Sequence, residues 1–484
     1  MRTGSNSLVK ELDLWKTDRH GFTTLQDEVS INVLPLQGKI PEWLSGTLIR
    51  NGPAKFAVGK QNYNHWFDGL AMLHKFSFTR GNVSYSNRFI RSKAYKKAED
   101  TGIISFPEFA TDPCRSIFSR VSTMFSSHTT DNTNVNIARV ANKFIAMTET
   151  PIPIEFDPHT LETVGVIDYN DHISGRLTTA HPHHDFDKKE TINYMTQFSR
   201  ESKYNIYRVI TGKNRELITS LRSKEPSYMH SFALTENYVI LVEFPLVINP
   251  IDLLVSGKPF IENFKWKPER GTKFTVVSRS DGKIVGSYHT DPFFAFHHVN
   301  AFEIENKIVL DIVTYQNDDI IRSLYLDVVR GNVKDKKTIP TSELRRYEIR
   351  LNSNFIEHET SHVMLELPRI NYRRNNMNDY DFMYAAGTHS IGDFTNRLIK
   401  INVKSKDFAV WSEKGCHPGE PVFVARPGGV QEDDGLVLSV VLDSNKENSY
   451  LLVLNAQSFE EIARAEVPHH IPYGIHGQYF GDIN

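Results

Sequence analysis

One pattern recurs along the whole chain: a short run of β-branched and aromatic residues, a polar turn, and a second such run. The turns carry pairs such as Arg-Gly, Asp-Pro and Asp-Gly, which favour tight reversals between antiparallel strands. Helical periodicity of any length is scarce by comparison. The five clearest copies span residues 76–85, 154–166, 274–285, 398–410 and 451–463.

Hairpins spread over all 484 residues are typical of a closed array of small sheets, and the β-propeller is the leading case. A chain of this length would ordinarily be expected to form two or three domains, but an all-β array of this kind can reach the same length as a single domain. Apart from a polar N-terminal stretch, residues 1–20, no linker or low-complexity block divides the sequence. We therefore expect a single domain over residues 1–484, although the copies are too degenerate for the blades to be counted.

Four histidines stand beside strand-like runs in distant parts of the chain: His181, His230, His297 and His476. His230 and His297 each open the same pattern, in which a strand, a Glu-Asn turn and a second strand follow the histidine. Because the innermost strands of all propeller blades begin around one axis, residues far apart in the sequence can meet there. Four imidazoles brought together in this way would form an all-nitrogen site for a metal ion.

Other interpretations of these histidines stay open. A single buried histidine is more often hydrogen-bonded to a backbone carbonyl than bound to a metal, and only the four similar contexts favour a metal site. Imidazole suits zinc, copper, nickel and ferrous iron; a closed tetrahedral zinc site would be structural, whereas open positions at ferrous iron would admit dioxygen. We assign structural or supporting roles to the neighbouring His183, His184 and His298.

Three glutamates stand at the ends of expected strands in apolar or proline-rich surroundings: Glu149, Glu366 and Glu420. A carboxylate is rarely buried without a partner, and the free ring N–H of a metal-bound imidazole is a suitable one. The alternative for each is a surface turn beside a proline. No convincing pairing of a nucleophile with a base occurs, so no catalytic residue is predicted beyond the metal centre.

The composition narrows the possible partners and compartments. A formal charge of -2 and an isoelectric point near 6.9 provide no basic face, so we expect no nucleic-acid binding. The two cysteines, Cys114 and Cys416, cannot form a disulfide framework, and the first residues lack the apolar core of a secretory signal. Since no apolar run approaches the length of a spanning helix, we expect a cytoplasmic protein with at most peripheral membrane contact.

Several short motifs occur in a fixed order around the four histidine contexts. Together they resemble the carotenoid cleavage oxygenases, and within that family the retinal-forming branch that contains the β-carotene central-cleavage oxygenases and the retinal pigment epithelium isomerohydrolase. The resemblance extends from about residue 28 to the C-terminus. The motifs occupy residues 46–53, 63–69, 420–424, 432–435 and 476–477.

This resemblance implies an all-β, seven-bladed propeller with a dome of loops and helices over an axial metal site. The ion would be ferrous iron, held by His181, His230, His297 and His476. Glu149, Glu366 and Glu420 would hold His230, His297 and His476 respectively, which leaves His181 without a carboxylate. A hydrophobic tunnel would lie under the dome, and candidates for its walls, or for simple core packing, are Phe67, Tyr228, Phe294 and Phe296.

The activity that the resemblance implies is a dioxygenase reaction. Molecular oxygen would be inserted across one double bond of a carotenoid or apocarotenoid, by expectation the central one, to give two retinal-type aldehydes. Two alternatives keep the same four histidines: an isomerohydrolase acting on a retinyl ester, and a non-enzymatic carotenoid-binding propeller with a structural metal. Cleavage of stilbene-like phenolics, also found in the family, is a less favoured option.

A carotenoid substrate would have to be drawn from lipid. Within residues 105–127, apolar side chains recur at helical spacing with Arg115 and Arg120 alongside, which indicates an amphipathic helix. This helix would either face a membrane, as the corresponding segment does in the family, or pack on the propeller. Residues 251–255 form a second, weaker apolar patch.

Overall fold

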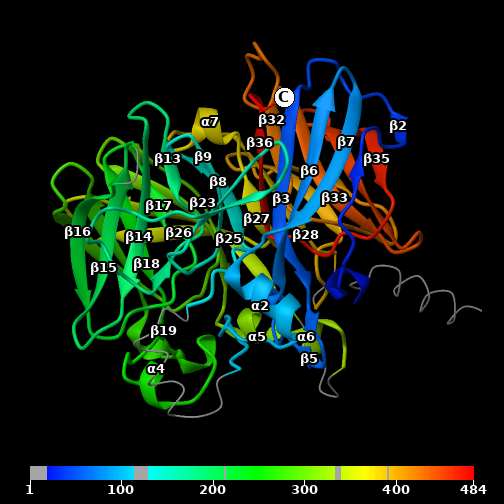
Figure 1. Cartoon of the computed structure of the whole chain (residues 1–484). Coiled ribbons are helices and arrows are strands. Elements are labelled where there is room, and N and C mark those ends of the chain that lie inside the picture. Colours follow the sequence, from blue (N-terminus) through cyan, green and yellow to red (C-terminus); the bar gives the residue numbers. More distant parts are fainter. Residues whose placement is uncertain (1–18, 114–128, 212–213, 333–338, 390–391, 484) are drawn as a thin grey trace, which may run out of the picture.

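The computed structural model describes residues 19–113, 129–211, 214–332, 339–389 and 392–483. Seven antiparallel sheets of four to six strands are arranged around a common axis, and this confirms the seven-bladed β-propeller (Figure 1). Each of the five hairpins expected from the sequence is present as a pair of neighbouring antiparallel strands. The local turn signals therefore located the strands correctly.

Five blades are built from strands that follow one another along the chain, and we number them two to six. Blade two contains β8 (Asn136–Val140), β9 (Lys143–Met147), β10 (Ile154–Phe156) and β11 (Thr163–Val166). Blade three contains β12 (Leu177–Thr178), β13 (His183–Asp185), β14 (Glu190–Gln197), β15 (Ser202–Val209) and β16 (Glu216–Ser223). Blade four contains β17 (Ala233–Leu234), β18 (Tyr238–Glu243), β21 (Thr272–Ser278) and β22 (Ile284–Thr290).

The next two blades repeat this order from the axis outward. Blade five contains β23 (His298–Ile304), β24 (Lys307–Tyr315), β25 (Ser342–Arg350) and β26 (Ile356–Ser361). Blade six contains β27 (Leu365–Arg369), β28 (Phe382–Gly387), β29 (Arg397–Asn402) and β30 (Phe408–Trp411).

Two blades combine strands from both ends of the chain. Blade one contains β36 (His476–Phe480), β3 (Gly46–Lys55), β6 (Leu70–Thr79), β7 (Asn82–Phe89) and β1 (Ser30–Ile31). Blade seven contains β31 (Cys416–Pro418), β32 (Val422–Ala425), β33 (Gly435–Asp443), β34 (Asn448–Asn455), β35 (Glu461–Val467) and β2 (Leu36–Gly38). The pairing of β36 with β3 and of β2 with β35 closes the ring.

Burial follows the position of a strand within its blade. The middle strand β34 is buried from Ser449 to Leu454, because the neighbouring blades cover both of its faces. The outermost strand β16 alternates between half-buried and exposed positions, because one of its faces meets solvent. Blades one and seven share a core that contains Leu48, Phe76 and Leu451. The stacking of blade on blade therefore supplies most of the apolar packing.

Short helices and small hairpins lie beyond the ends of the blades. In Figure 1, α2, α4, α5 and α6 gather at one end of the propeller, and α7 lies at the other. The helices are η1 (Arg19–Phe22), η2 (Trp66–Asp68), α2 (Lys93–Thr101), α4 (Asp252–Val255), η3 (Ile261–Asn263), η4 (Pro268–Arg270), α5 (Asp319–Ser323), α6 (Leu326–Val329) and α7 (Tyr372–Asn375). The two-stranded sheets pair β4 (Ala57–Val58) with β5 (Gln61–Asn62), and β19 (Leu246–Val247) with β20 (Lys265–Trp266).

Polar contacts hold η2 in place under the dome. The buried His65 ring accepts a hydrogen bond from the Phe67 N–H at 3.1 Å, and the Asp68 carboxylate accepts one from the His65 N–H at 3.0 Å. Thr111 donates its hydroxyl to Asp68 at 2.6 Å, while burial raises the pKa of Asp68 to about 6. The Trp66 N–H donates to the Leu324 carbonyl at 3.1 Å. These contacts fix Trp66 and Phe67 against the segment that follows α5.

Two predictions from the sequence fall on residues that are only partly described. Of the expected membrane-facing segment 105–127, residues 114–127 lie outside the described residues, and so does Cys114. Cys416 is buried, and within the described residues it forms no disulfide. In the described part of the chain, no helix is both long enough and apolar enough to cross a membrane.

Candidate metal centre

The propeller brings the four histidines of the sequence analysis together at its axis. His476 is the first residue of β36, His297 directly precedes β23, His230 lies shortly before β17, and His181 lies between β12 and β13. One nitrogen from each ring lies within 4.8 Å of the others. The shortest approaches join the Nε2 atoms of His181 and His230, at 3.0 Å, and of His297 and His476, at 3.2 Å.

These spacings fit a shared cation. Two nitrogens that each lie roughly 2.1 Å from one ion are about 3.0 Å apart at a right angle and about 3.4 Å apart at a tetrahedral angle. The His181–His230 distance matches the right-angled case, and the His297–His476 distance lies midway between the two. Both distances are therefore compatible with four imidazole nitrogens that hold one ion.

Three of the rings are oriented by the three glutamates singled out in the sequence. Each Nδ1–H donates to a carboxylate oxygen, so that the Nε2 lone pair faces the centre. Among the described residues, no carboxylate lies within hydrogen-bonding distance of the His181 ring. The three distances are 2.7 Å from His230 to Glu149, 2.6 Å from His297 to Glu366, and 2.7 Å from His476 to Glu420.

Each glutamate has a second partner that the sequence did not reveal. The Tyr228 hydroxyl donates to Glu149 at 2.8 Å, and the Tyr315 hydroxyl donates to Glu366 at 3.0 Å. Glu420 instead forms ion pairs with the buried Arg50 and with Arg369, the latter at 3.4 Å. Tyr228 could have been recognised, because it stands two residues before His230 in an extended segment, where side chains at that spacing share a face.

The protonation states of these groups suit metal binding. Burial, together with the other three imidazoles, lowers the pKa of His181 well below its ordinary value. Burial lowers the pKa of His476 to about 3, although Glu420 opposes the shift. Burial raises the pKa of Glu366 and Glu420, but the histidine partner of each, with the arginines beside Glu420, leaves both pKa values below normal. At neutral pH, His181 and His476 are therefore neutral ligands and both carboxylates are charged.

An apolar cavity reaches this cluster. Its wall includes the side chains of His230 and His297, and also Phe67 and Phe296, two of the four predicted tunnel residues. The other two do not border the cavity: Phe294 packs on Phe296 with ring centroids 5.0 Å apart, and Tyr228 stacks on Phe294 at 6.2 Å. Further lining residues are Trp66, Ile320, Leu324, Met364, Leu367, Phe394 and Ile475.

The neighbouring histidines contact protein groups rather than the centre. The His183 ring lies 2.9 Å from the Phe232 carbonyl and 3.1 Å from the Tyr372 hydroxyl. His184 Nδ1 lies 2.9 Å from the Thr191 hydroxyl, and His298 Nδ1 lies 2.8 Å from the Ser231 hydroxyl. These contacts support the structural roles assigned to His183, His184 and His298.

We expect substitutions of Glu149 and Glu420 to have similar effects on metal affinity but different effects on folding stability. Glu149→Gln retains an acceptor for His230 but removes the charge, and metal affinity should fall about 10-fold to 100-fold with little change in folding stability. Glu420→Gln should lower metal affinity similarly and, because it leaves the buried Arg50 uncompensated, also destabilise the fold by about 3–5 kcal/mol.

Chelator competition and chemical denaturation would measure the two effects. Glu359→Gln is the matched control, because this side chain is 76% exposed and makes only a loose ion pair with Lys406. Equal stability losses for Glu149→Gln and Glu420→Gln would contradict the distinction between their partners.

Comparison with known proteins agrees with this architecture. Residues 22–481 match the family described as RPE65, retinal pigment epithelial membrane protein. The chain is 34% identical to a mitochondrial carotenoid-cleaving dioxygenase from Mustela putorius furo, over 95% of both chains. It is also 34% identical to a β,β-carotene 15,15'-dioxygenase from Rattus norvegicus, over 92% of this chain and 88% of that one.

A solved structure shows the same fold. A Glu150Asp variant of the Synechocystis apocarotenoid oxygenase superposes with a TM-score of 0.85 at 25% identity, over 97% of this chain and 98% of that one. The chain therefore belongs to the family of the retinal pigment epithelial membrane protein and the carotenoid cleavage oxygenases.

Proposed function

We propose that this protein is a ferrous-iron dioxygenase that cleaves a double bond of a carotenoid or apocarotenoid, the central one, to give retinal-type aldehydes. The observation that carries the proposal is the convergence of four imidazoles, two of which, His230 and His297, form part of the wall of an apolar cavity. The relatives' names support the substrate class, and the β,β-carotene 15,15'-dioxygenase supports the central bond.

The side chains around the cavity suit a substrate made of hydrocarbon. A polyene has no polar group on which a catalytic acid or base could act, so it must be bound by shape and by apolar contact. Trp66, Phe67, Phe296 and Phe394 provide aromatic walls close to the histidines. By filling the space around the substrate these side chains exclude water, and the depth of the cavity selects which double bond reaches the metal centre.

The residues of the chain and the metal divide the chemistry between them. Ferrous iron would supply the redox chemistry that activates dioxygen. Glu149, Glu366 and Glu420 hold the ring protons on the outer nitrogens, so three of the imidazoles present lone pairs to the ion. In the balanced reaction one carbon–carbon double bond is broken and each fragment receives one oxygen atom of O2.

The proposal predicts the products of a defined incubation. Ferrous protein with β-carotene under ¹⁸O₂ should yield two molecules of retinal, each carrying one labelled oxygen when the sample is quenched quickly. One O2 should be consumed for each carotenoid, and His181→Ala should abolish both. Mass spectrometry and an oxygen electrode provide the two measurements, with β-apocarotenals as the second substrate class.

Other outcomes identify the alternatives. Two aldehydes of unequal length would place the cleavage away from the centre. Turnover of a retinyl ester to an isomerised alcohol without oxygen consumption would indicate an isomerohydrolase. Tight carotenoid binding without any product would indicate a binding protein. The first result would contradict the choice of the central bond, and each of the last two would contradict the proposed dioxygenase activity.

Enlarging the cavity should loosen the choice of bond. Leu324 lines the cavity, whereas Leu326 is similarly buried in α6 but does not. We expect Leu324→Ala to add products cut at neighbouring double bonds, because the substrate can shift along the cavity. Leu326→Ala should lower stability by a similar amount, about 2–5 kcal/mol, while keeping a single product pair. Identical product profiles for the two variants would contradict selection by depth.

We further propose that the protein binds membranes peripherally, with its α4 end toward the lipid, and acts in the cytoplasm. Ile251 and Val255, at the two ends of α4, are 60% and 67% exposed, and Ile103, after α2, is 52% exposed. In Figure 1 both helices lie at the same end of the propeller. The Ile261 N–H donates to the Phe109 carbonyl at 3.0 Å, so residue 109 of the expected membrane segment lies beside this end.

Vesicle sedimentation tests the orientation. Ile251→Asp combined with Val255→Asp should reduce binding to phosphatidylcholine vesicles several-fold, because apolar burial in the interface is replaced by charge. Val430→Asp is the control: this valine is 81% exposed, and its carbonyl accepts a hydrogen bond from Arg374 in α7, at the opposite end. Equal losses for both variants would contradict the proposed orientation.

A further inference from the structure

His181 is held differently from the other three ligands. Each of the others has a carboxylate on its Nδ1, whereas the described residues offer none to His181. Its own N–H donates to the Thr179 hydroxyl at 3.0 Å, and the carbonyl of Ala180 accepts from Asn136 at 2.8 Å. The orientation of the His181 ring must therefore depend on the position of the His181 backbone. The two contacts above fix that backbone on the N-terminal side of the residue.

On the C-terminal side, only Pro182 separates His181 from β13. This short strand pairs with β14, and its last residue, Asp185, lies directly opposite Glu190. Two buried carboxylates thus face one another at the turn end of the hairpin, where they are 3% and 7% exposed. Without a cation between them they would repel each other and separate the strands.

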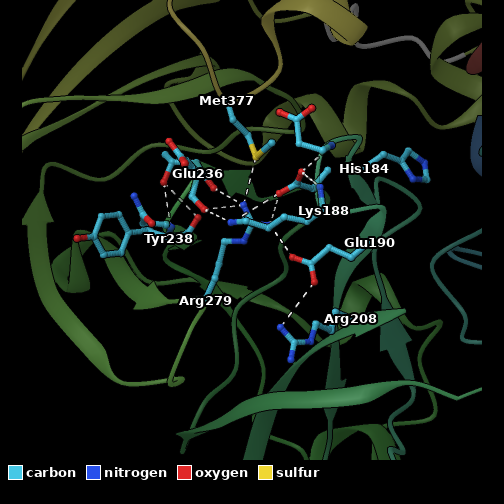
Figure 2. Close-up of polar contacts among 12 residues, drawn as sticks. His184, Lys188, Glu190, Arg208, Glu236, Tyr238, Arg279 and Met377 are labelled. Atoms are coloured by element: carbon cyan, nitrogen blue, oxygen red, sulfur yellow. Dashed lines mark hydrogen bonds and ion pairs between the residues drawn. The ribbon is translucent and has the colours of Figure 1, made fainter. Parts of the chain in front are cut away.

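Arg279 supplies that cation from the neighbouring blade. It follows β21 in blade four, and its Nη2 lies 2.5 Å from Asp185 and 2.6 Å from Glu190. The side chain is 4% exposed, and Figure 2 shows it at the centre of the polar contacts, with Glu190 and Met377 around it. One guanidinium therefore bridges both partners of the cross-strand pair.

The opposite edge of the guanidinium is anchored to the backbone of blade four. Nη1 donates to the carbonyls of Thr235 and Glu236, each at 2.8 Å, and the Arg279 N–H donates to the Asn237 carbonyl at 2.9 Å. These three carbonyls form the turn between β17 and β18, the strands that follow His230. Arg279 thereby fixes the β13–β14 hairpin relative to blade four, which follows His230, another of the four ligands.

Lys188 and Arg208 do not replace this contact. Lys188 Nζ lies 3.9 Å from Asp185, with its side chain 47% exposed, and Arg208 lies 3.6 Å from Glu190, with its side chain 36% exposed. Burial raises the pKa of Asp185, but hydrogen bonds from the Lys188 N–H and from Arg279 leave it below its ordinary value. The carboxylate is therefore charged at neutral pH and depends on the guanidinium.

We propose that Arg279 is the positioning residue of His181: by clamping Asp185 and Glu190 to blade four, it takes the part that a glutamate takes for each of the other three ligands. Loss of the clamp leaves β13 to be held by the contacts of His183 and His184 with Phe232, Tyr372 and Thr191, and Pro182, with its restricted backbone, passes a shift of the strand to His181. The inference rests on the metal site within the proposed function and is independent of the substrate.

Cobalt(II) is the probe for the test, because its electron paramagnetic resonance spectrum reports ligand geometry without any turnover. We expect Arg279→Met to change the cobalt spectrum and to weaken cobalt binding about tenfold or more. Arg279→Lys, which retains a cation, should recover part of the affinity. Asp185→Asn, which preserves the shape of the side chain and removes one charge, should alter the cobalt spectrum in the same direction. If Arg279→Met does not fold, the spectrum of Asp185→Asn tests the assignment of Arg279 in its place.

Lys400→Met is the matched control for general destabilisation. Lys400 is 7% exposed, lies in β29 and forms a 2.6 Å ion pair with Asp433, which shortly precedes β33 of blade seven, away from the clamp on β13. It should lower the unfolding temperature but leave the cobalt spectrum unchanged.

Two results separate failure of the inference from failure of the metal site. Wild-type spectra and affinities for folded Arg279→Met and Asp185→Asn would overturn the assignment of Arg279 alone. Wild-type cobalt binding by His181→Ala would overturn the four-histidine site and the assignment together. Loss of carotenoid cleavage in any variant, taken alone, decides neither.

Discussion

The hydrogen bond from an imidazole Nδ1–H to a buried carboxylate is the interaction on which the rest of this structure depends. An imidazole can carry its proton on either nitrogen, and only an outward acceptor keeps the inner lone pair free. The acceptors come from other blades: Glu366 of blade six serves His297, and Glu420 of blade seven serves His476. The same bonds that orient the ligands thus also join the blades around the axis.

Glu149 departs from this neighbour-to-neighbour order. It follows β9 in blade two yet serves His230, which leads into blade four, so its contact passes over blade three. Blade three contributes His181, the ligand to which the described part of the chain offers no carboxylate. The Arg279 clamp joins blades three and four at the outer end of β13. The Glu149–His230 hydrogen bond near the axis connects blades two and four, and the Arg279 clamp connects blades three and four. Together they tie three consecutive blades to one another.

Local chemistry made much of this molecule predictable. Turn pairs such as Asp281-Gly282 identified hairpins, and the shared pattern after His230 and His297 identified equivalent inner strands. Arg50, Arg369 and Tyr315 were missed, because their contacts with Glu420 and Glu366 join segments far apart in the sequence and leave no periodic signal. Arg279 stands in a Ser-Arg-Ser-Asp-Gly turn that indicates a solvent-exposed loop, and only the hairpin of the adjacent blade buries it. Tyr228 was predicted as a cavity wall, but its hydroxyl faces Glu149.

The closure of the ring by β36 also sets an order of events during synthesis. Segments of a chain emerge in sequence, and early ones can begin to fold before later ones exist. His181, His230 and His297 are available before the strand that carries His476, and that strand pairs with β3 from the beginning of the ring. A nascent chain that has not yet reached His476 can therefore present three of the four ligands. The complete set of four forms only after β36 has been made and has paired with β3.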